Sequence, residues 1–193
     1  MKQTKQKKKK YRGGCIGLFA FVLCAVALII VMPKAAHSVF PQKYEAYVDK
    51  YCDRFGMDKF FILAVIKTES NFDPRAESDV GARGLMQIMN DAYEWVAFRM
   101  DDSRELTYDD MFDPETNIEY GTYLLMLLYD EYGDERTALA AYHAGRGCVN
   151  GWLSDSDYSS DGRKLDTIPS AATAHYVSKV MNTYDVYRVL YDK

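Results

Sequence analysis

The sequence predicts a mainly α-helical domain that follows a membrane-spanning segment. Three observations support this fold class. Apolar residues recur at spacings of three and four along most of the chain beyond residue 43, capping residues stand where these stretches begin, and strand-like alternation is nearly absent. An uncharged, mostly apolar run over residues 15–32 precedes the helical part. We therefore expect a single helical domain over residues 44–193, large enough to bury its own core.

The N-terminal segments have the charge pattern of a signal-anchor. Residues 1–12 hold seven of the 24 Lys and Arg residues and no acid. The apolar run would form a helix about 27 Å long, close to the hydrocarbon thickness of a bilayer. Because basic flanks stay in the cytoplasm, we predict a cytoplasmic tail (1–12), a transmembrane helix (13–32), a linker (33–43) and an extracytoplasmic domain. Secretion after cleavage near Ala36-His37-Ser38 is the alternative.

Charge and cysteine content restrict the partners. Beyond residue 12 the chain carries 17 basic and 28 acidic side chains, a formal net charge of −11. Phosphate backbones bind basic surfaces, so we exclude nucleic acid as a partner. Cys52 and Cys148 lie outside the apolar run and could pair in an oxidising compartment, but their separation in space does not follow from the sequence.

The first half of the domain is predicted to contain helices on both sides of a loop. A helix begins near Tyr44 and ends at Gly56, and Asp58 then caps a second helix over roughly 59–69. Turn-forming residues indicate a loop over 71–84. The next helix is expected from Leu85 to Phe98.

The second half is also predicted to be helical. Asp113-Pro114 starts a helix that reaches about Tyr132, because Asp caps helices and Pro suits their first turn. Gly133 closes that helix, and Asp134 caps another that ends at Ala144-Gly145. A polar loop over 154–166 follows, and a long helix over 171–191 completes the chain.

Glu69 is the most informative residue in this pattern. It ends the apolar helix over 59–69, where desolvation raises the pKa of a carboxyl group so that it keeps a proton near neutral pH. Cleavage of a glycosidic bond needs a general acid of this kind. A helix-terminal Glu alone is more often a solvated surface residue, and the sequence around it decides between the two interpretations.

Four blocks of sequence, taken together in this order, resemble the soluble lytic transglycosylase family. They are ESNFDP over 69–74, AESDVGARGLMQIM over 76–89, DPETNIEYGTYL over 113–124 and AAYHAG over 140–145. Ile168-Pro169 and Tyr176-Val177 extend the resemblance, which covers about residues 44–190.

The resemblance implies a goose-type-lysozyme-like α fold with a single catalytic domain acting on peptidoglycan. Members of the family cleave the β-1,4 bond between N-acetylmuramic acid and N-acetylglucosamine and leave a 1,6-anhydro-muramyl end. One carboxyl group, here Glu69, then serves first as general acid and afterwards as base for the muramyl 6-hydroxyl. The resemblance implies no metal ion and no cofactor, and leaves protein partners unknown.

The resemblance also assigns substrate-binding residues. Ser78, Gln87, Met89 and Tyr142 fall on positions that contact sugar or orient the acid, and Tyr142 is expected to face Glu69. His143 stands where the family commonly has Asn, and supplies either some of the amide's hydrogen bonds or a charge that titrates. The alternative interpretations are that Ser78 caps a turn and that Met89 is a core residue.

The chain departs from the family pattern at further positions. Asn90 replaces a common Pro, and Ala172 and Ala174 replace a Glu and an Arg that follow Ile-Pro in many members. These changes leave Glu69 untouched and put glycan contacts near Ala172 in question.

Two other functions remain open from the sequence. A hydrolytic muramidase would need a second carboxylate, for which Asp73, Glu77 and Asp79 are the nearest candidates. The departures at Ala172 and Ala174 also allow a catalytically impaired glycan-binding scaffold in envelope assembly.

Overall fold

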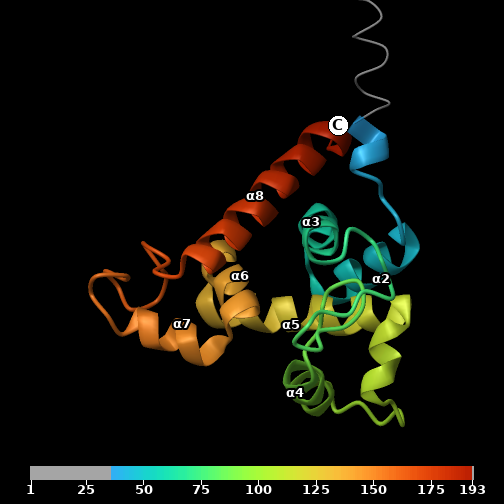
Figure 1. Ribbon diagram of the computed structural model, residues 1–193, viewed down its shortest axis with the longest axis horizontal. Coiled ribbons are helices and arrows are strands. Elements are labelled where there is room, and N and C mark those ends of the chain that lie inside the picture. The colour runs from blue at the N-terminus through green and yellow to red at the C-terminus, as the bar shows by residue number, and fades with distance from the viewer. Residues whose placement is uncertain (1–35, 193) are drawn as a thin grey trace, which may run out of the picture. The chain divides into compact units, whose positions relative to one another are not determined.

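The computed structural model describes residues 36–192 (Figure 1). The chain divides into two units between Pro41 and Gln42, and the second unit holds the helical domain. In the first unit residues 36–39, within the predicted linker, are helical. The predicted tail and transmembrane helix lie outside the described residues. Within the described range, no helix is long and apolar enough to cross a membrane.

The domain is mainly α-helical, as predicted. Its elements are α2 (Glu45–Phe55), α3 (Lys59–Glu69), α4 (Asn90–Met100), the short 3₁₀ helix η1 (Tyr108–Phe112), α5 (Pro114–Tyr132), α6 (Glu135–Ala144), α7 (Arg146–Leu153) and α8 (Ala171–Tyr191). In the described part of the chain, β pairing is limited to two isolated bridges, Glu77 with Arg83 and Arg83 with Ile88.

Local capping chemistry sets most helix boundaries, as the sequence predicted. The Asp58 carboxylate accepts hydrogen bonds from the Phe60 and Phe61 amides at the start of α3. Asp113 and Asp134 likewise cap α5 and α6. These aspartates satisfy amide groups that a helix start leaves without partners.

One expected helix start is wrong, and one helix was missed. The helix expected from Leu85 begins only at Asn90, because Gln87 adopts a left-handed backbone conformation (φ 49°) that ends any helix there. The helix α7 was not predicted, since Gly147 and Gly151 lower its helix propensity. It forms because it buries Val149 and Leu153.

The two cysteines of the domain do not pair. Cys52 is buried in α2 and Cys148 is exposed in α7, and both are free thiols. Burial raises the pKa of the Cys52 thiol to about 12, so Cys52 behaves as an unreactive core residue.

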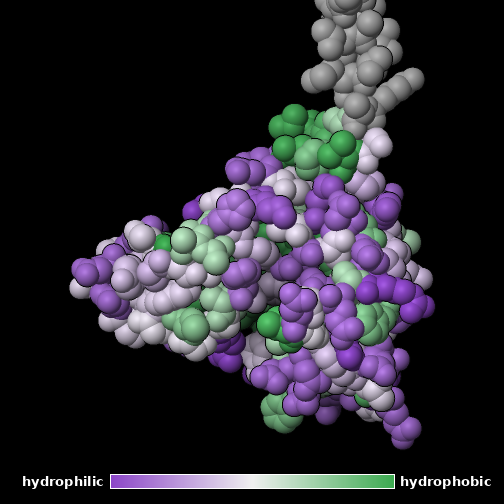
Figure 2. All heavy atoms as spheres, viewed as in Figure 1, coloured by the Kyte–Doolittle hydropathy of each residue, from purple (hydrophilic) through white to green (hydrophobic). Residues whose placement is uncertain are grey.

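The core is built around α3. The run Phe61–Ile66 is buried throughout, with exposed fractions of 4% or less. Helix α3 packs against α8, which also packs against α6 (Figure 1). Hydrophilic residues cover most of the visible face, with smaller apolar patches between them (Figure 2). This packing brings the C-terminal ends of α3 and α6 to the first turns of α8.

A buried amide on α5 fixes the loop between α3 and α4. The side chain of Asn117 is fully buried, and its Oδ1 accepts from the Met86 amide at 2.8 Å. Its Nδ2 donates to the Arg83 carbonyl at 3.0 Å and to the Met111 carbonyl at 2.8 Å. Gly84 is required beside it, because a Cβ there would collide with the Met111 carbonyl and with Asn117 itself.

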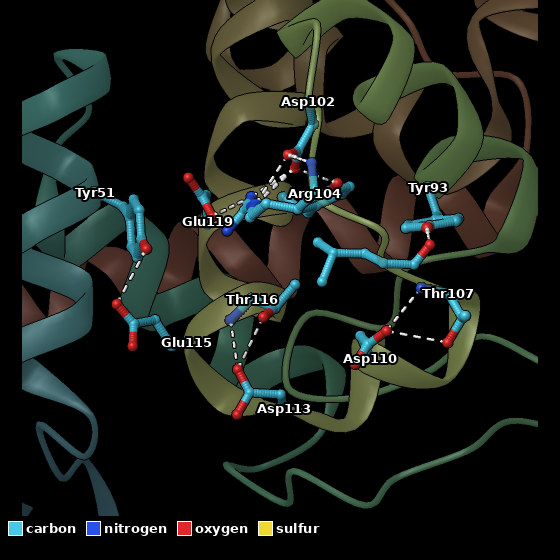
Figure 3. A network of polar contacts seen from close by, with 12 residues as sticks. Tyr51, Tyr93, Asp102, Arg104, Thr107, Asp110, Asp113, Glu115, Thr116 and Glu119 are labelled. Atoms are coloured by element: carbon cyan, nitrogen blue, oxygen red, sulfur yellow. Dashed lines mark hydrogen bonds and ion pairs between the residues drawn. The ribbon is translucent and has the colours of Figure 1, made fainter.

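An ion-pair network joins α2, α5 and the segment after α4 (Figure 3). Glu119 on α5 is 3% exposed and accepts from Arg54 at 2.6 Å and from Arg104 at 2.8 Å. Arg104 also pairs with Asp102, which accepts from the Tyr120 hydroxyl at 2.7 Å. The buried Glu119 is thus compensated by two guanidinium groups, as a buried charge requires.

Asn117→Asp is expected to destabilise the domain by about 2–4 kcal/mol, because the new carboxylate faces two carbonyl groups and cannot donate to them. Urea unfolding monitored by circular dichroism measures the change. The control is Asn182→Asp at an exposed position on α8, for which we expect less than about 0.5 kcal/mol. Equal effects of the two substitutions would show that Asn117 does not fix the loop.

Candidate active site

Glu69 is the last residue of α3, directly after the buried run of that helix. Burial raises the pKa of its carboxyl group to about 7. A hydrogen bond from Tyr176 and the charge of Lys179 act in the opposite direction, and burial outweighs both. The carboxyl group is therefore suited to exchange a proton near neutral pH.

Tyr176 on α8 holds the Glu69 carboxyl group. Its hydroxyl donates to Glu69 Oε1 at 2.6 Å, and the Tyr176 side chain is 8% exposed. Burial and the nearby Glu69 charge raise the pKa of Tyr176 well above 10, so the hydroxyl remains a donor. Lys179, one turn further along α8, places its Nζ 3.5 Å from the Thr68 carbonyl oxygen.

Tyr142 supports the loop rather than the acid. Its hydroxyl donates to the Met86 carbonyl at 2.6 Å and not to Glu69, which Tyr142 was expected to face. The two groups are nevertheless close enough that the Glu69 charge contributes to raising the pKa of Tyr142, after burial. Tyr142 on α6 thus lies beside the acid and fixes the loop that passes it.

Ser78 and Gln87 also bond to the backbone of this loop. Ser78 Oγ accepts from the Ala82 amide at 2.9 Å, so Ser78 caps a turn, as the alternative interpretation of this residue predicted. Gln87 Nε2 donates to the Ala76 carbonyl at 3.1 Å and to the Gly84 carbonyl at 3.0 Å. These bonds, with the left-handed conformation of Gln87, determine the path of the loop in front of α4.

Met89 and His143 occupy exposed positions. Met89 precedes α4 and is 42% exposed, so it is not the core residue of the alternative interpretation. His143, near the end of α6, stacks on the Tyr176 ring with a centroid separation of 4.5 Å, and its Nδ1 lies 3.2 Å from Thr173 Oγ1. Burial lowers the pKa of His143, which favours the neutral ring over an added charge near pH 7.

Sequence reasoning missed two residues of the site. Tyr176 belongs to a matching block but was not among the candidate site residues, although it contacts Glu69 directly. Ser70 was quoted only as a neighbour, yet its Oγ donates to the Leu85 carbonyl at 2.7 Å and ties the end of α3 to the loop. In the sequence, both residues could have been proposed from their positions in the blocks that resemble the family.

The acidic residues of the loop do not form a partner for Glu69. Asp73, Glu77 and Asp79 are exposed, and Glu77 pairs with Arg83. The charge that acts on Glu69 is that of Lys179, and no carboxylate contributes to its pKa. Over residues 36–192, no three His, Cys, Asp or Glu side chains come together in a way that could hold a metal ion.

The fold and site together define a class: a helical domain in which a tyrosine orients a carboxyl group of raised pKa at the end of a buried helix. The family model described as "Transglycosylase SLT domain" matches residues 46–165. The chain therefore belongs to the transglycosylase SLT domain family.

Relatives and solved structures agree with this assignment. The chain is 33% identical over 150 residues to the soluble lytic murein transglycosylase of Escherichia coli, covering 77% of this chain and 23% of that protein. It is 30% identical over 181 residues to the membrane-bound lytic murein transglycosylase C of Sodalis glossinidius, covering 81% of this chain and 48% of that one. The 70 kDa soluble lytic transglycosylase structure from Escherichia coli superposes with a TM-score of 0.71 at 29% identity, covering 80% of this chain and 25% of that chain. The chain thus spans from 23% to 48% of the length of these proteins.

Glu69→Gln is expected to stabilise the domain above pH 7 and not at pH 4. Because the folded-state pKa is raised from 4.5 to about 7, the folded protein holds this proton more tightly than the unfolded chain does. The stability gained from binding this proton in the folded state is fully present below pH 4.5 and is lost as the pH rises through about 7. Gln carries no charge to desolvate, so we expect the free energy of unfolding, measured in urea at pH 8, to rise by about 1–3 kcal/mol in the variant. Glu105→Gln, at an exposed position, is the control; equal gains at pH 4 and pH 8 would contradict the shift.

Proposed function

We propose that this chain is a peptidoglycan lytic transglycosylase that cleaves the β-1,4 bond between N-acetylmuramic acid and N-acetylglucosamine. The observation that carries the proposal is the Glu69 carboxyl group, with a pKa of about 7 and a 2.6 Å hydrogen bond from Tyr176, in a chain of the transglycosylase SLT domain family.

The relatives support the same activity. Proteins named lytic murein transglycosylases include both those called soluble and those called membrane-bound. A 70-kDa soluble lytic transglycosylase has been solved in complex with bulgecin A. An inactive variant of the Pseudomonas aeruginosa enzyme, with Glu replaced by Gln, aligns with a TM-score of 0.68 at 28% identity over 78% of this chain and 24% of that chain.

In the first step, the protonated Glu69 acts as general acid. Because Oε1 accepts the Tyr176 hydroxyl, the transferable proton belongs on Oε2. It passes to the glycosidic oxygen as the bond to the muramyl anomeric carbon breaks, and N-acetylglucosamine leaves as an alcohol. The Tyr176 hydroxyl stabilises the carboxylate that forms.

In the second step, the Glu69 carboxylate acts as base. It accepts the proton of the muramyl 6-hydroxyl as that oxygen bonds to the anomeric carbon, which closes the 1,6-anhydro ring and restores the protonated acid. A pKa near 7 suits a group that must first donate and then accept a proton.

Further residues are proposed to bind the glycan around Glu69. Met89 and His143 offer exposed side chains for direct contact. Ser78, Gln87 and Tyr142 bond to the loop backbone, and we assign them mainly to holding the binding surface in shape.

Hydrolysis is less well supported than transglycosylation. The two-carboxylate designs place the second acid about 5–9.5 Å from the first. Within the described residues no carboxylate affects the Glu69 titration, and the loop acids are exposed. An intramolecular nucleophile, the muramyl 6-hydroxyl, removes the need for a second acid.

Glu69→Gln is expected to lower the release of muropeptides from purified sacculi by about 10²–10⁴-fold, because Gln cannot donate the proton. Mass spectrometry of the wild-type products is expected to show anhydro-muramyl ends, lighter by one water than hydrolytic products. The matched control, Asp73→Asn in the exposed part of the loop, should retain activity. Wild-type turnover by Glu69→Gln would remove the catalytic assignment, and reducing muramyl ends would replace transglycosylation by hydrolysis.

We also propose that residues 13–32 anchor the domain to the membrane as a single-pass helix with the N-terminus in the cytoplasm. The support is the apolar run with its basic flank; the Sodalis glossinidius relative is named membrane-bound. The full chain is expected in the membrane fraction. A chain that begins at Gln42 is expected in the aqueous fraction with an unchanged helical circular dichroism spectrum, because the buried apolar residues of the described structure all lie at Val48 or beyond. A shortened, secreted product of the full chain would indicate signal cleavage instead.

A further inference from the structure

His143 has two contacts that tie α6 to the start of α8. One face of its ring stacks on the Tyr176 ring, with centroids 4.5 Å apart and planes 30° apart. Its Nδ1 lies 3.2 Å from Thr173 Oγ1. Thr173 and Tyr176 are three residues apart on one helix, so they occupy the same face of α8 and His143 lies across both.

Hydrogen-bond directions define how the imidazole is held. The Thr173 hydroxyl donates to Ser170 Oγ at 3.1 Å, and Ser170 is the N-cap of α8. With this direction the Thr173 oxygen can accept from His143 Nδ1, in the tautomer that carries the proton on Nδ1. The contact thereby links His143 to the cap that starts α8.

The stacked partner is the residue that holds the acid. Tyr176 donates to Glu69 Oε1 at 2.6 Å across 107 residues of chain. A change of the Tyr176 χ1 angle would swing the whole side chain and move the hydroxyl away from Oε1, and the stacked imidazole opposes this movement on one side of the ring. His143 therefore restricts the donor that fixes the Glu69 carboxyl group.

The first turn of α8 has no charged residues to hold it. Ala172 and Ala174 stand where the family pattern often has Glu and Arg, and Ala172 is exposed. The buried side chain of this turn is that of Thr173, 2% exposed. His143, which stands where the family commonly has Asn, is the residue of α6 that reaches Thr173.

We propose that His143 is a positioning residue: it holds the Tyr176 hydroxyl on Glu69 and, through Thr173, secures the first turn of α8. The inference rests on the proposed function only in taking Glu69 as the acid. An Asn at this position could bond to Thr173 but has no ring to stack on Tyr176.

The test is to follow the ¹³C NMR resonance of the Glu69 carboxyl carbon as a function of pH in the full-length chain in mild detergent. The resonance is assigned by its absence from the spectrum of Glu69→Gln. The titratable groups facing this carboxyl group are Tyr176 and Lys179 from α8 and Tyr142 from α6. Because the Tyr176 hydrogen bond lowers the pKa of Glu69, weakening that bond raises it. We expect Tyr176→Phe to raise the midpoint by about one pH unit and His143→Ala by about half a unit.

A double variant separates positioning from other roles. If His143 acts through Tyr176, adding His143→Ala to Tyr176→Phe produces no further change in the midpoint. His143→Phe keeps a stacked ring and is expected to retain the wild-type midpoint, whereas His143→Asn shifts it as His143→Ala does. The Asn variant carries the family's common residue, so it also covers the case in which the alanine variant does not fold.

Several results would overturn the inference. One is an unchanged midpoint in both His143→Ala and His143→Asn, and another is additive shifts in the double variant. A third is a rise in KM for muropeptide release while kcat and the midpoint stay unchanged, which would make His143 a glycan contact only. The NMR measurement needs no turnover. An inactive wild-type chain that shows the expected shifts would therefore reject the proposed function and leave the positioning role of His143 in place.

Discussion

The packing of α8 against the C-terminal end of α3 is the constraint on which the site depends. It removes the Glu69 carboxyl group from water and supplies, in Tyr176, the donor that orients it. These two effects oppose each other in the pKa of Glu69, and burial is the larger. A site with burial alone would leave the carboxyl group without a fixed geometry, and a site with the hydrogen bond alone would leave it ionised at neutral pH.

The frame around this acid consists largely of side chains bonded to backbone. Asn117, Gln87, Ser70 and Tyr142 each bond to main-chain groups of the loop between α3 and α4. The loop residues that supply these backbone groups do so whatever their side chains, except at Gly84, where the close approach leaves no room for a Cβ. The frame does not tolerate changes of the framing residues themselves, because each would leave a buried polar group without a partner.

The features of the fold that could be predicted from the sequence are those set by interactions between residues close together in the chain. Asp58, Asp113 and Asp134 each cap a helix within three residues of their own position, so helix starts could be inferred from neighbours in sequence. The path of residues 85–89 could not, since the left-handed conformation of Gln87 belongs to a loop held by Asn117 from another helix. Glu69 was found because a helix end and a family motif coincide there. The Tyr176 contact depends on tertiary packing alone, and the bond of Tyr142 to Met86 rather than to Glu69 could be learned only from the structure.

The distribution of the site along the chain has a consequence for folding. The acid lies on α3 and its tyrosine on α8, 107 residues further along the chain, so the pair forms only when these two helices have docked. Before that contact forms, Glu69 has neither the hydrogen bond from Tyr176 nor the burial that α8 contributes. The carboxyl group therefore acquires its raised pKa from tertiary folding and not from the formation of α3 alone.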